Sequence, residues 1–221
     1  MTAMTESNPT LAQRFHWRRL FQYRLRTLLI LTTIIAVLLG WWSYKARQQR
    51  EAVAALKKVG GFFSYDFHEK GLDRPPYWPV WLVDRVGVDY FANVEAGDFV
   101  NNSTDAGLEN LECLTSLKEI SLDRTHVTDK SLEYMKGLTK LRLIGLSETK
   151  VTDAGLEFLQ DLIALETLNL DNTHVSDAGL EYLKGLKSLK YLSLVNTQVT
   201  DAGAARLKKA LPKCQISTGQ R

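Results

Sequence analysis

The sequence predicts an α/β solenoid, with short parallel strands on one face and short helices on the other, preceded by a transmembrane helix. Two observations support this prediction. A motif recurs every 24 residues through the C-terminal half of the chain, and a fixed period of that size is typical of stacked supersecondary units. An uncharged, largely apolar stretch over residues 27–44 comes before the repeats, and it is long enough to span a bilayer.

Composition bounds the architecture. A chain of 221 residues with 45% hydrophobic and 24% charged residues has room for one folded domain and an appendage, and it is not compositionally disordered. Residues 1–58 hold ten Lys and Arg against two Asp and Glu, whereas the rest holds eighteen against twenty-three. The basic excess therefore belongs to the N-terminal arm, and we expect no nucleic acid among the partners.

The apolar stretch has the features of a membrane span. As a helix, residues 27–44 would be about 27 Å long, close to the thickness of a bilayer's hydrocarbon core. Cations flank it on both sides, and Trp41, Trp42 and Tyr44 stand where aromatic rings favour the lipid–water boundary. We predict a basic arm over residues 1–26 and a transmembrane helix over residues 27–44. A cleaved signal peptide is the main alternative, and a buried core helix is a lesser one.

The flanking cations also predict an orientation. Five arginines precede the span and three cations follow it closely: Arg14, Arg18, Arg19, Arg24 and Arg26, then Lys45, Arg47 and Arg50. Because cytoplasmic flanks carry the excess of Lys and Arg, we expect the N-terminus in the cytoplasm. The repeat domain of this single-pass cell-membrane protein would then be extracytoplasmic.

Each repeat has two halves. An aspartate preceded by Thr or Ser marks one half, at Asp105, Asp129, Asp153, Asp177 and Asp201. The other half has the form L-x-x-L-x-L-x-x-T-x-V, and its four full copies begin at Leu117, Leu141, Leu165 and Leu189.

This pattern resembles the leucine-rich-repeat family, with Thr in place of the family's Asn or Cys. The Thr-Asp-Ala-Gly-Leu copies are similar to ribonuclease-inhibitor-like and F-box-associated repeats, which also occur in bacterial membrane-anchored proteins. The resemblance covers residues 91–217. It implies a strand and a short helix in each repeat, and a fold that serves many binding functions.

The residues of one repeat agree with that fold. In Ile120-Ser-Leu122 the alternation turns Ile and Leu inward, as in a strand, whereas Leu132, Met135 and Leu138 recur at helical spacing. Thr or Ser followed by Asp fits a helix start, and either residue can be the N-cap. The repeated threonines should form a structural ladder, because each follows a strand where backbone groups need partners: Thr125, Thr149, Thr173 and Thr197.

Residues 45–90 are expected to hold a juxtamembrane helix and an N-terminal cap. The helix would run from Ala46 to Val59 and end at Gly60-Gly61, followed by a strand over residues 62–67 and a loop over residues 68–76. The aromatics of residues 77–81 would cap the stack by packing on Leu108 and Leu111, with insertion at the membrane surface as the alternative. Residues 211–216 read as a truncated last strand, and residues 218–221 as a tail.

We expect binding on the strand face. Its outward positions form three columns: Glu119, Leu143, Thr167 and Tyr191; Ser121, Gly145, Asn169 and Ser193; and Asp123, Ser147, Asp171 and Val195. Apolar residues at three of these positions favour a protein partner, or else a cell-envelope polymer. The alternative functions are an intracellular substrate adaptor and, as a third hypothesis, a membrane-bound hydrolase. The sequence predicts no oligomeric state.

Catalytic and metal chemistry is not expected. His126 and His174 should lie about 10 Å apart, too far for one metal ion. Ser121, Asp123 and His126 have the residue types of a catalytic triad, but an exposed ridge offers no enclosed pocket. Cys113 and Cys214 should lie about 20 Å apart and not bridge each other. We therefore predict no catalytic residues, metal or cofactor, and no enzymatic activity.

Overall fold

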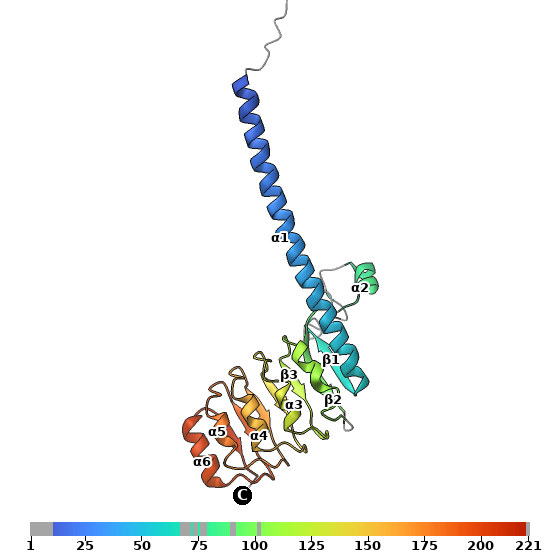
Figure 1. Ribbon diagram of the computed structural model, residues 1–221. Coiled ribbons are helices and arrows are strands. Elements are labelled where there is room, and N and C mark those ends of the chain that lie inside the picture. The colour runs from blue at the N-terminus through green and yellow to red at the C-terminus, as the bar shows by residue number, and fades with distance from the viewer. Residues whose placement is uncertain are drawn as a thin grey trace, which may run out of the picture. The chain divides into compact units, whose positions relative to one another are not determined.

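The computed structural model of the chain describes residues 11–66, 72, 75, 79–88, 92–100 and 103–219, with the side chains described from residue 26 onward except at 80 and 86. The chain divides into two compact units, Met1–Lys45 and Ala46–Arg221. Helix α1 (Leu11–Lys58) contributes to both of them (Figure 1). The predicted arm therefore lies within this helix from Leu11 onward, and residues 1–10 lie outside the described residues.

The described residues of the first unit, from Leu11 to Lys45, are helical. By length and composition, the helical segment Arg26–Lys58 is able to cross a membrane. Its large apolar side chains between Leu28 and Leu39 are exposed, each by 46% or more. Thr32 and Thr33, the polar residues of this stretch, both donate their hydroxyls to the Leu29 carbonyl, at 2.9 and 2.7 Å. Nothing in the described chain covers the apolar stretch.

The second unit is a seven-stranded sheet in strand order β1-β2-β3-β4-β5-β6-β7 (Figure 1). The strands are β1 (Gly61–Tyr65), β2 (Val94–Phe99), β3 (Glu119–Ser121), β4 (Leu143–Gly145), β5 (Thr167–Asn169), β6 (Tyr191–Ser193) and β7 (Gln215–Ser217). β1 and β2 are antiparallel, and every later pair is parallel. The predicted parallel sheet is confirmed, with one strand per repeat.

Helices cover the other face of the sheet. They are η3 (Leu108–Cys113), α3 (Asp129–Glu133), α4 (Asp153–Leu156), η4 (Glu157–Leu159), α5 (Leu180–Leu183) and α6 (Asp201–Ala210). Leu132, Met135 and Leu138 are fully buried, and so are Leu146 and Leu170, which directly follow β4 and β5. The inward assignment of both halves of the repeat is therefore correct, and the core runs continuously through the stack.

The N-terminal end of the stack is closed differently from the prediction. Val53 and Leu56 of α1 are buried in the same core as Leu108 and Leu111, together with Phe99 of β2. Ser103 donates its hydroxyl to the Val59 carbonyl at 2.7 Å. The C-terminal part of α1, β1 and β2 therefore form the cap, and the predicted juxtamembrane helix is the end of a longer helix.

The predicted aromatic cap is wrong at Trp81. This residue lies in α2 (Val80–Val86) and is 67% exposed. Residues 77 and 78 lie outside the described residues, as do 68–71, 73, 74 and 76 of the predicted loop. The prediction failed because aromatic content does not distinguish a core residue from an exposed one, whereas the helical spacing of Val53 and Leu56 did mark a buried face.

At the C-terminal end of the array the predicted truncated last strand is present. α6 is the longest helix of the array, and β7 pairs with β6 from Gln215 to Ser217 as a truncated last strand. Leu207 and Leu211 are buried beneath it. Of the predicted tail, residues 220 and 221 lie outside the described residues.

Candidate functional site

The strands place the predicted columns in register. Glu119 is paired with Leu143, Leu143 with Thr167, and Thr167 with Tyr191. Ser121, Gly145, Asn169 and Ser193 form the second row in the same way. The residues between these rows, Ile120, Ile144, Leu168 and Leu192, are buried. The first two columns therefore run straight across the outward face of the sheet.

The first column is the accessible one. Glu119 is exposed, Leu143 and Thr167 are half-buried, and Tyr191 is 56% exposed. Neighbouring strands lie about 4.8 Å apart, so the four side chains span about 14 Å across the sheet. The column therefore presents a carboxylate at Glu119, an aliphatic side chain at Leu143, a hydroxyl at Thr167 and an aromatic ring at Tyr191.

The aspartates of the third column form hydrogen bonds within the fold. Asp123 accepts the backbone N–H of Ser147 in the next repeat at 2.6 Å, and Asp171 accepts that of Val195 at 2.7 Å. A Cβ at Gly145 would lie 2.7 Å from the Asp123 carboxylate, so the glycine makes room for this carboxylate. The absence of a side chain at position 145 therefore serves this contact within the fold.

Each of the four strands β3 to β6 is followed by a turn that contains one residue in the left-handed conformation. The residues Arg124, Glu148, Asn172 and Asn196 all have φ between 55° and 58°. Asn favours this conformation among non-glycine residues, whereas Arg and Glu adopt it with strain. The side chains at these four turn positions are exposed and recur at the 24-residue period. The Asn196 side-chain amide donates to the Asn172 side-chain oxygen at 3.0 Å.

The threonine ladder is confirmed as structural. Thr125, Thr149, Thr173 and Thr197 each donate their hydroxyl to the carbonyl three residues earlier, at 2.6 to 2.8 Å. The first three are buried. The hydroxyl satisfies a backbone acceptor where the chain leaves the strand, so these side chains are not available to a ligand.

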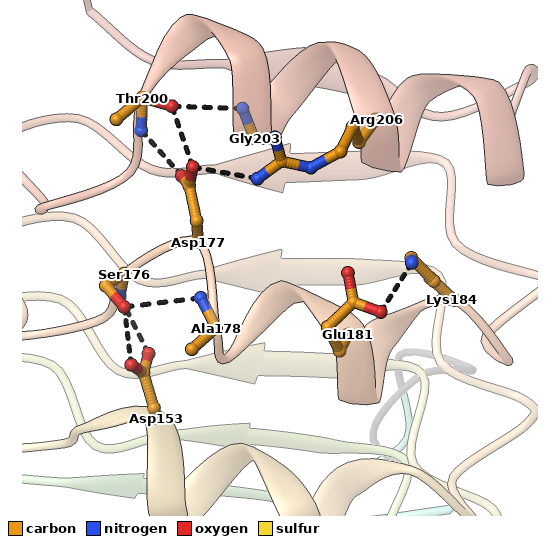
Figure 2. Close-up of polar contacts among 9 residues, drawn as sticks. All are labelled: Asp153, Ser176, Asp177, Ala178, Glu181, Lys184, Thr200, Gly203 and Arg206. Atoms are coloured by element: carbon orange, nitrogen blue, oxygen red, sulfur yellow. Dashed lines mark hydrogen bonds and ion pairs between the residues drawn. The ribbon is translucent and has the colours of Figure 1, made fainter.

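The repeated aspartates connect each repeat to the next. Asp153 accepts both the backbone N–H and the hydroxyl of Ser176, at 2.7 and 2.6 Å, and Asp177 accepts the same two groups of Thr200 at 2.8 Å (Figure 2). Asp105 and Asp129 repeat the arrangement with Thr128 and Thr152. A carboxylate with two donors is a strong inter-repeat contact.

Three helices of the array are capped by a threonine, which settles the choice between Thr and Asp there. Thr128 and Thr152 are the N-caps of α3 and α4. Each hydroxyl accepts the backbone N–H of the residue two positions later in the chain, at 3.4 and 3.3 Å. Thr200 caps α6 by accepting from Gly203 at 3.1 Å. In these three helices the Thr is the cap, whereas α5 begins after Gly179 without a side-chain cap. The Asp that follows Thr128, Thr152 or Ser176 is turned toward the next repeat.

Two of these aspartates have a lowered pKa. Burial acts to raise the pKa of Asp105, but hydrogen bonds from Ser131 and Thr128 outweigh it and the net shift is downward. The backbone N–H and hydroxyl of Thr200 lower the pKa of Asp177, and Arg206, whose guanidinium lies 3.0 Å away, lowers it further. Both carboxyls are therefore held in the charged form that the linkage requires.

A family model matches two consecutive segments of the array. The leucine-rich-repeat model matches residues 164–184 and 185–208. The repeats are leucine-rich repeats. No curated protein matches the sequence.

Solved structures with leucine-rich repeats are similar to this chain. An internalin from Listeria monocytogenes is 19% identical, with a TM-score of 0.39, and the match covers 54% of this chain and 39% of the internalin. A leucine-rich-repeat protein of Leptospira interrogans is 24% identical, with a TM-score of 0.40 and coverage of 49% and 27%. The ectodomain of the receptor kinase SOBIR1 from Arabidopsis thaliana is 14% identical, with a TM-score of 0.45 and coverage of 79% and 93%. The chain spans less than half the length of the first two.

The leucine-rich repeats do not assemble the triad considered in the sequence. Asp123 is engaged with Ser147, and its second oxygen accepts from Ser121 at 3.4 Å. His126 is exposed, and its backbone N–H donates to the Ser103 carbonyl at 2.9 Å. Among the described residues, no group of three His, Cys, Asp or Glu side chains is placed to hold a metal ion.

The two cysteines are free thiols, as expected. Burial raises the pKa of both thiols, Cys113 and Cys214, and the charge of Glu112 adds to this effect at Cys113. A raised pKa keeps the thiol protonated at neutral pH, so both are poor nucleophiles.

Proposed function

We propose that this chain is a single-pass membrane protein that displays its leucine-rich repeats outside the cytoplasm, where their strand face binds a protein partner. The observation that carries the binding proposal is Tyr191, which is 56% exposed in a strand column that also holds Leu143. Tyrosine is a common anchor of protein interfaces, because it combines a large apolar ring with a hydroxyl. Most other outward positions are polar or engaged within the fold.

The membrane anchor is supported by the exposed apolar surface of α1. A contiguous apolar surface is costly in water, and the described chain offers nothing that covers it. The hydroxyls of Thr32 and Thr33 are bonded within the helix, so they present no unpaired donor to lipid. Lys45 lies 4.9 Å from the centre of the Trp41 ring, and both residue types favour the membrane interface.

Anchoring and orientation are tested with the full chain in cells. The chain should stay in the membrane fraction after alkaline extraction and keep its full mass, because an uncleaved anchor retains residues 1–44. A C-terminal alkaline phosphatase fusion should be active, since that reporter works only outside the cytoplasm. Release by alkali, loss of the first 45 residues, or a fusion active only in the cytoplasm would each contradict part of the proposal. The last result favours an intracellular adaptor.

The binding face is tested by site-specific crosslinking in the same cells. A photo-reactive amino acid at Thr167, between Leu143 and Tyr191, should crosslink to a protein of defined mass. Tyr191→Ala should reduce the crosslinked product several-fold, because a central interface tyrosine often contributes 2 kcal/mol or more, about thirtyfold in affinity. Ile163→Ala is the matched control, since Ile163 is 66% exposed outside the strand face. An unchanged product with Tyr191→Ala would exclude this face.

A further inference from the structure

The last strand of the array has an open edge. β7 is the terminal strand of the described sheet, and it pairs on one side only, with β6. The Gln215 N–H donates to the Lys190 carbonyl at 2.7 Å, and the Leu194 N–H donates to the Ser217 carbonyl at 2.7 Å. Because backbone groups alternate in direction along a strand, those of Ile216 point away from β6, toward the open edge. Such an edge is a template for another strand.

Helix α6 lies beside this edge and carries charges of opposite sign at its two ends. Asp201, Ala204, Ala205 and Lys208 of α6 line one open groove, and the segment after the helix contributes Lys213, Gln215, Ile216 and Thr218. The spacing of the four α6 residues places them along one side of the helix. Asp201 and Lys208 are exposed, and Ala205 between them is small and exposed. The Lys208 ammonium also donates to the Cys214 carbonyl at 2.5 Å, which holds it at this end of the stack and leaves it two further donors.

This arrangement is complementary to itself. Asp201 and Lys208 lie at equal distances along the sequence from the point between Ala204 and Ala205. If a second α6 runs antiparallel across that point, each Asp201 faces the other copy's Lys208, and the alanines let the two backbones approach closely. We propose that the partner of this end is a second copy of the chain, joined by a two-fold axis through α6 and β7.

One axis satisfies both elements. A two-fold axis perpendicular to the plane of the sheet makes both the strand and the helix of the second copy run in the opposite direction. It leaves strand facing strand and helix facing helix, because the layers are not exchanged. β7 would then pair antiparallel with its copy, and the two Ile216 residues would exchange N–H and carbonyl groups. The helix layer and the sheet would both continue from one copy into the other. This interface buries the open groove and leaves the strand-face column around Tyr191 free.

The test exchanges charges in the full chain, purified in detergent and measured by light scattering after size-exclusion chromatography. Wild type should show the mass of two chains. Asp201→Lys would place two lysines opposite each other at both contacts, and Lys208→Asp would place two aspartates there. The dissociation constant of the dimer should therefore rise at least about tenfold in each single variant. Mixing the two variants should restore a dimer, because in the mixed pair both contacts again join opposite charges.

Lys209→Asp is the matched control. Lys209 is an exposed neighbour on the same helix that does not line the groove, so the same change of charge there should leave the dimer intact. A monomeric wild type would overturn the proposal. So would a dimer that survives both single exchanges, because that dimer would be held elsewhere, for example through the apolar part of α1. Single variants that dissociate but do not recombine would also overturn it, and thermal melts show that each is folded.

Discussion

At the scale of single residues, the glycines of the Asp-Ala-Gly motif have a defined role. A Cβ at Gly155, Gly179 or Gly203 would overlap the carboxylate of the aspartate in the preceding repeat, at Asp129, Asp153 or Asp177. Ser131 occupies the equivalent position of the first full repeat, and its hydroxyl donates to Asp105. Glycine or a hydrogen-bonding serine is therefore required where the aspartate crosses to the next repeat.

Gly179→Ala should lower the free energy of unfolding by about 1–3 kcal/mol, the usual range for overpacking. The overlapping Cβ would displace Asp153 from Ser176 and so weaken the contact between two repeats. Guanidinium denaturation of the full chain in detergent measures the effect. Gly137→Ala is the control, because nothing lies within 4 Å of a Cβ there. Equal effects of the two substitutions would show that the carboxylate contact is not what requires glycine.

The lowered pKa of Asp177 predicts a dependence of stability on pH. A carboxyl whose pKa is lower in the folded than in the unfolded state stabilises the fold fully above the unfolded value, about 3.9, and the stabilisation is lost as the pH falls through the folded pKa. The free energy of unfolding should therefore fall between pH 5 and pH 2, and Asp177→Asn should make that fall smaller. Asp161→Asn, at an exposed loop carboxylate, should leave the fall unchanged.

The candidate site was only partly visible in the sequence. The period of 24 residues located the columns of the strand face, including Leu143 and Tyr191, because register follows from equal repeats. It did not reveal that Asp123 and Asp171 bind backbone groups of the next repeat, since that depends on the twist and spacing of successive turns. A signal was present at Gly145, which is the smallest residue of its column and lies beside Asp123.

At the scale of elements, each repeat is held by a strand and by leucines that no single repeat can bury alone. Leu170 is fully buried between β5 and the helices. Leu170→Ala should lower the free energy of unfolding by about 2–5 kcal/mol through cavity formation. Thermal unfolding followed by circular dichroism measures this, with Ile163→Ala as the exposed control. A melt unchanged by Leu170→Ala would contradict the inward assignment.

The elements of the array were predictable because each has a periodic signature. Strand alternation at Ile120 and Leu122 and helical spacing at Leu132 and Met135 both led to buried positions. The N-terminal cap was less predictable, because β1 and β2 pair antiparallel outside the repeat pattern. A strand was predicted over residues 62–67, and β1 runs from Gly61 to Tyr65. Its partner lies about thirty residues away in a part of the chain without a repeated motif.

At the scale of the whole molecule, a stack of repeats must close both of its ends. At the N-terminal end Leu56 of α1 is fully buried against the first repeat, and Gln49 donates to the Ala92 carbonyl at 2.9 Å. At the other end α6 covers the helix side, whereas one edge of β7 is unpaired within the described sheet. The two ends therefore differ: one is closed within the chain, and the other is suited to a contact between chains.

The cap defines where a soluble fragment has to begin. A fragment of residues 46–221 keeps Val53, Leu56, β1 and β2 and should unfold cooperatively. One that starts at Val88 loses the helix and β1, exposes Leu108 and Leu111, and should melt at a clearly lower temperature or not fold, because a stack of four full repeats has little stability to spare. Circular dichroism melts compare the two. Leu56→Asp in the longer fragment should reproduce the loss, whereas Lys57→Asp, at the exposed neighbouring position, should not. Equal melting temperatures of the two fragments would show that the repeats are stable without this cap.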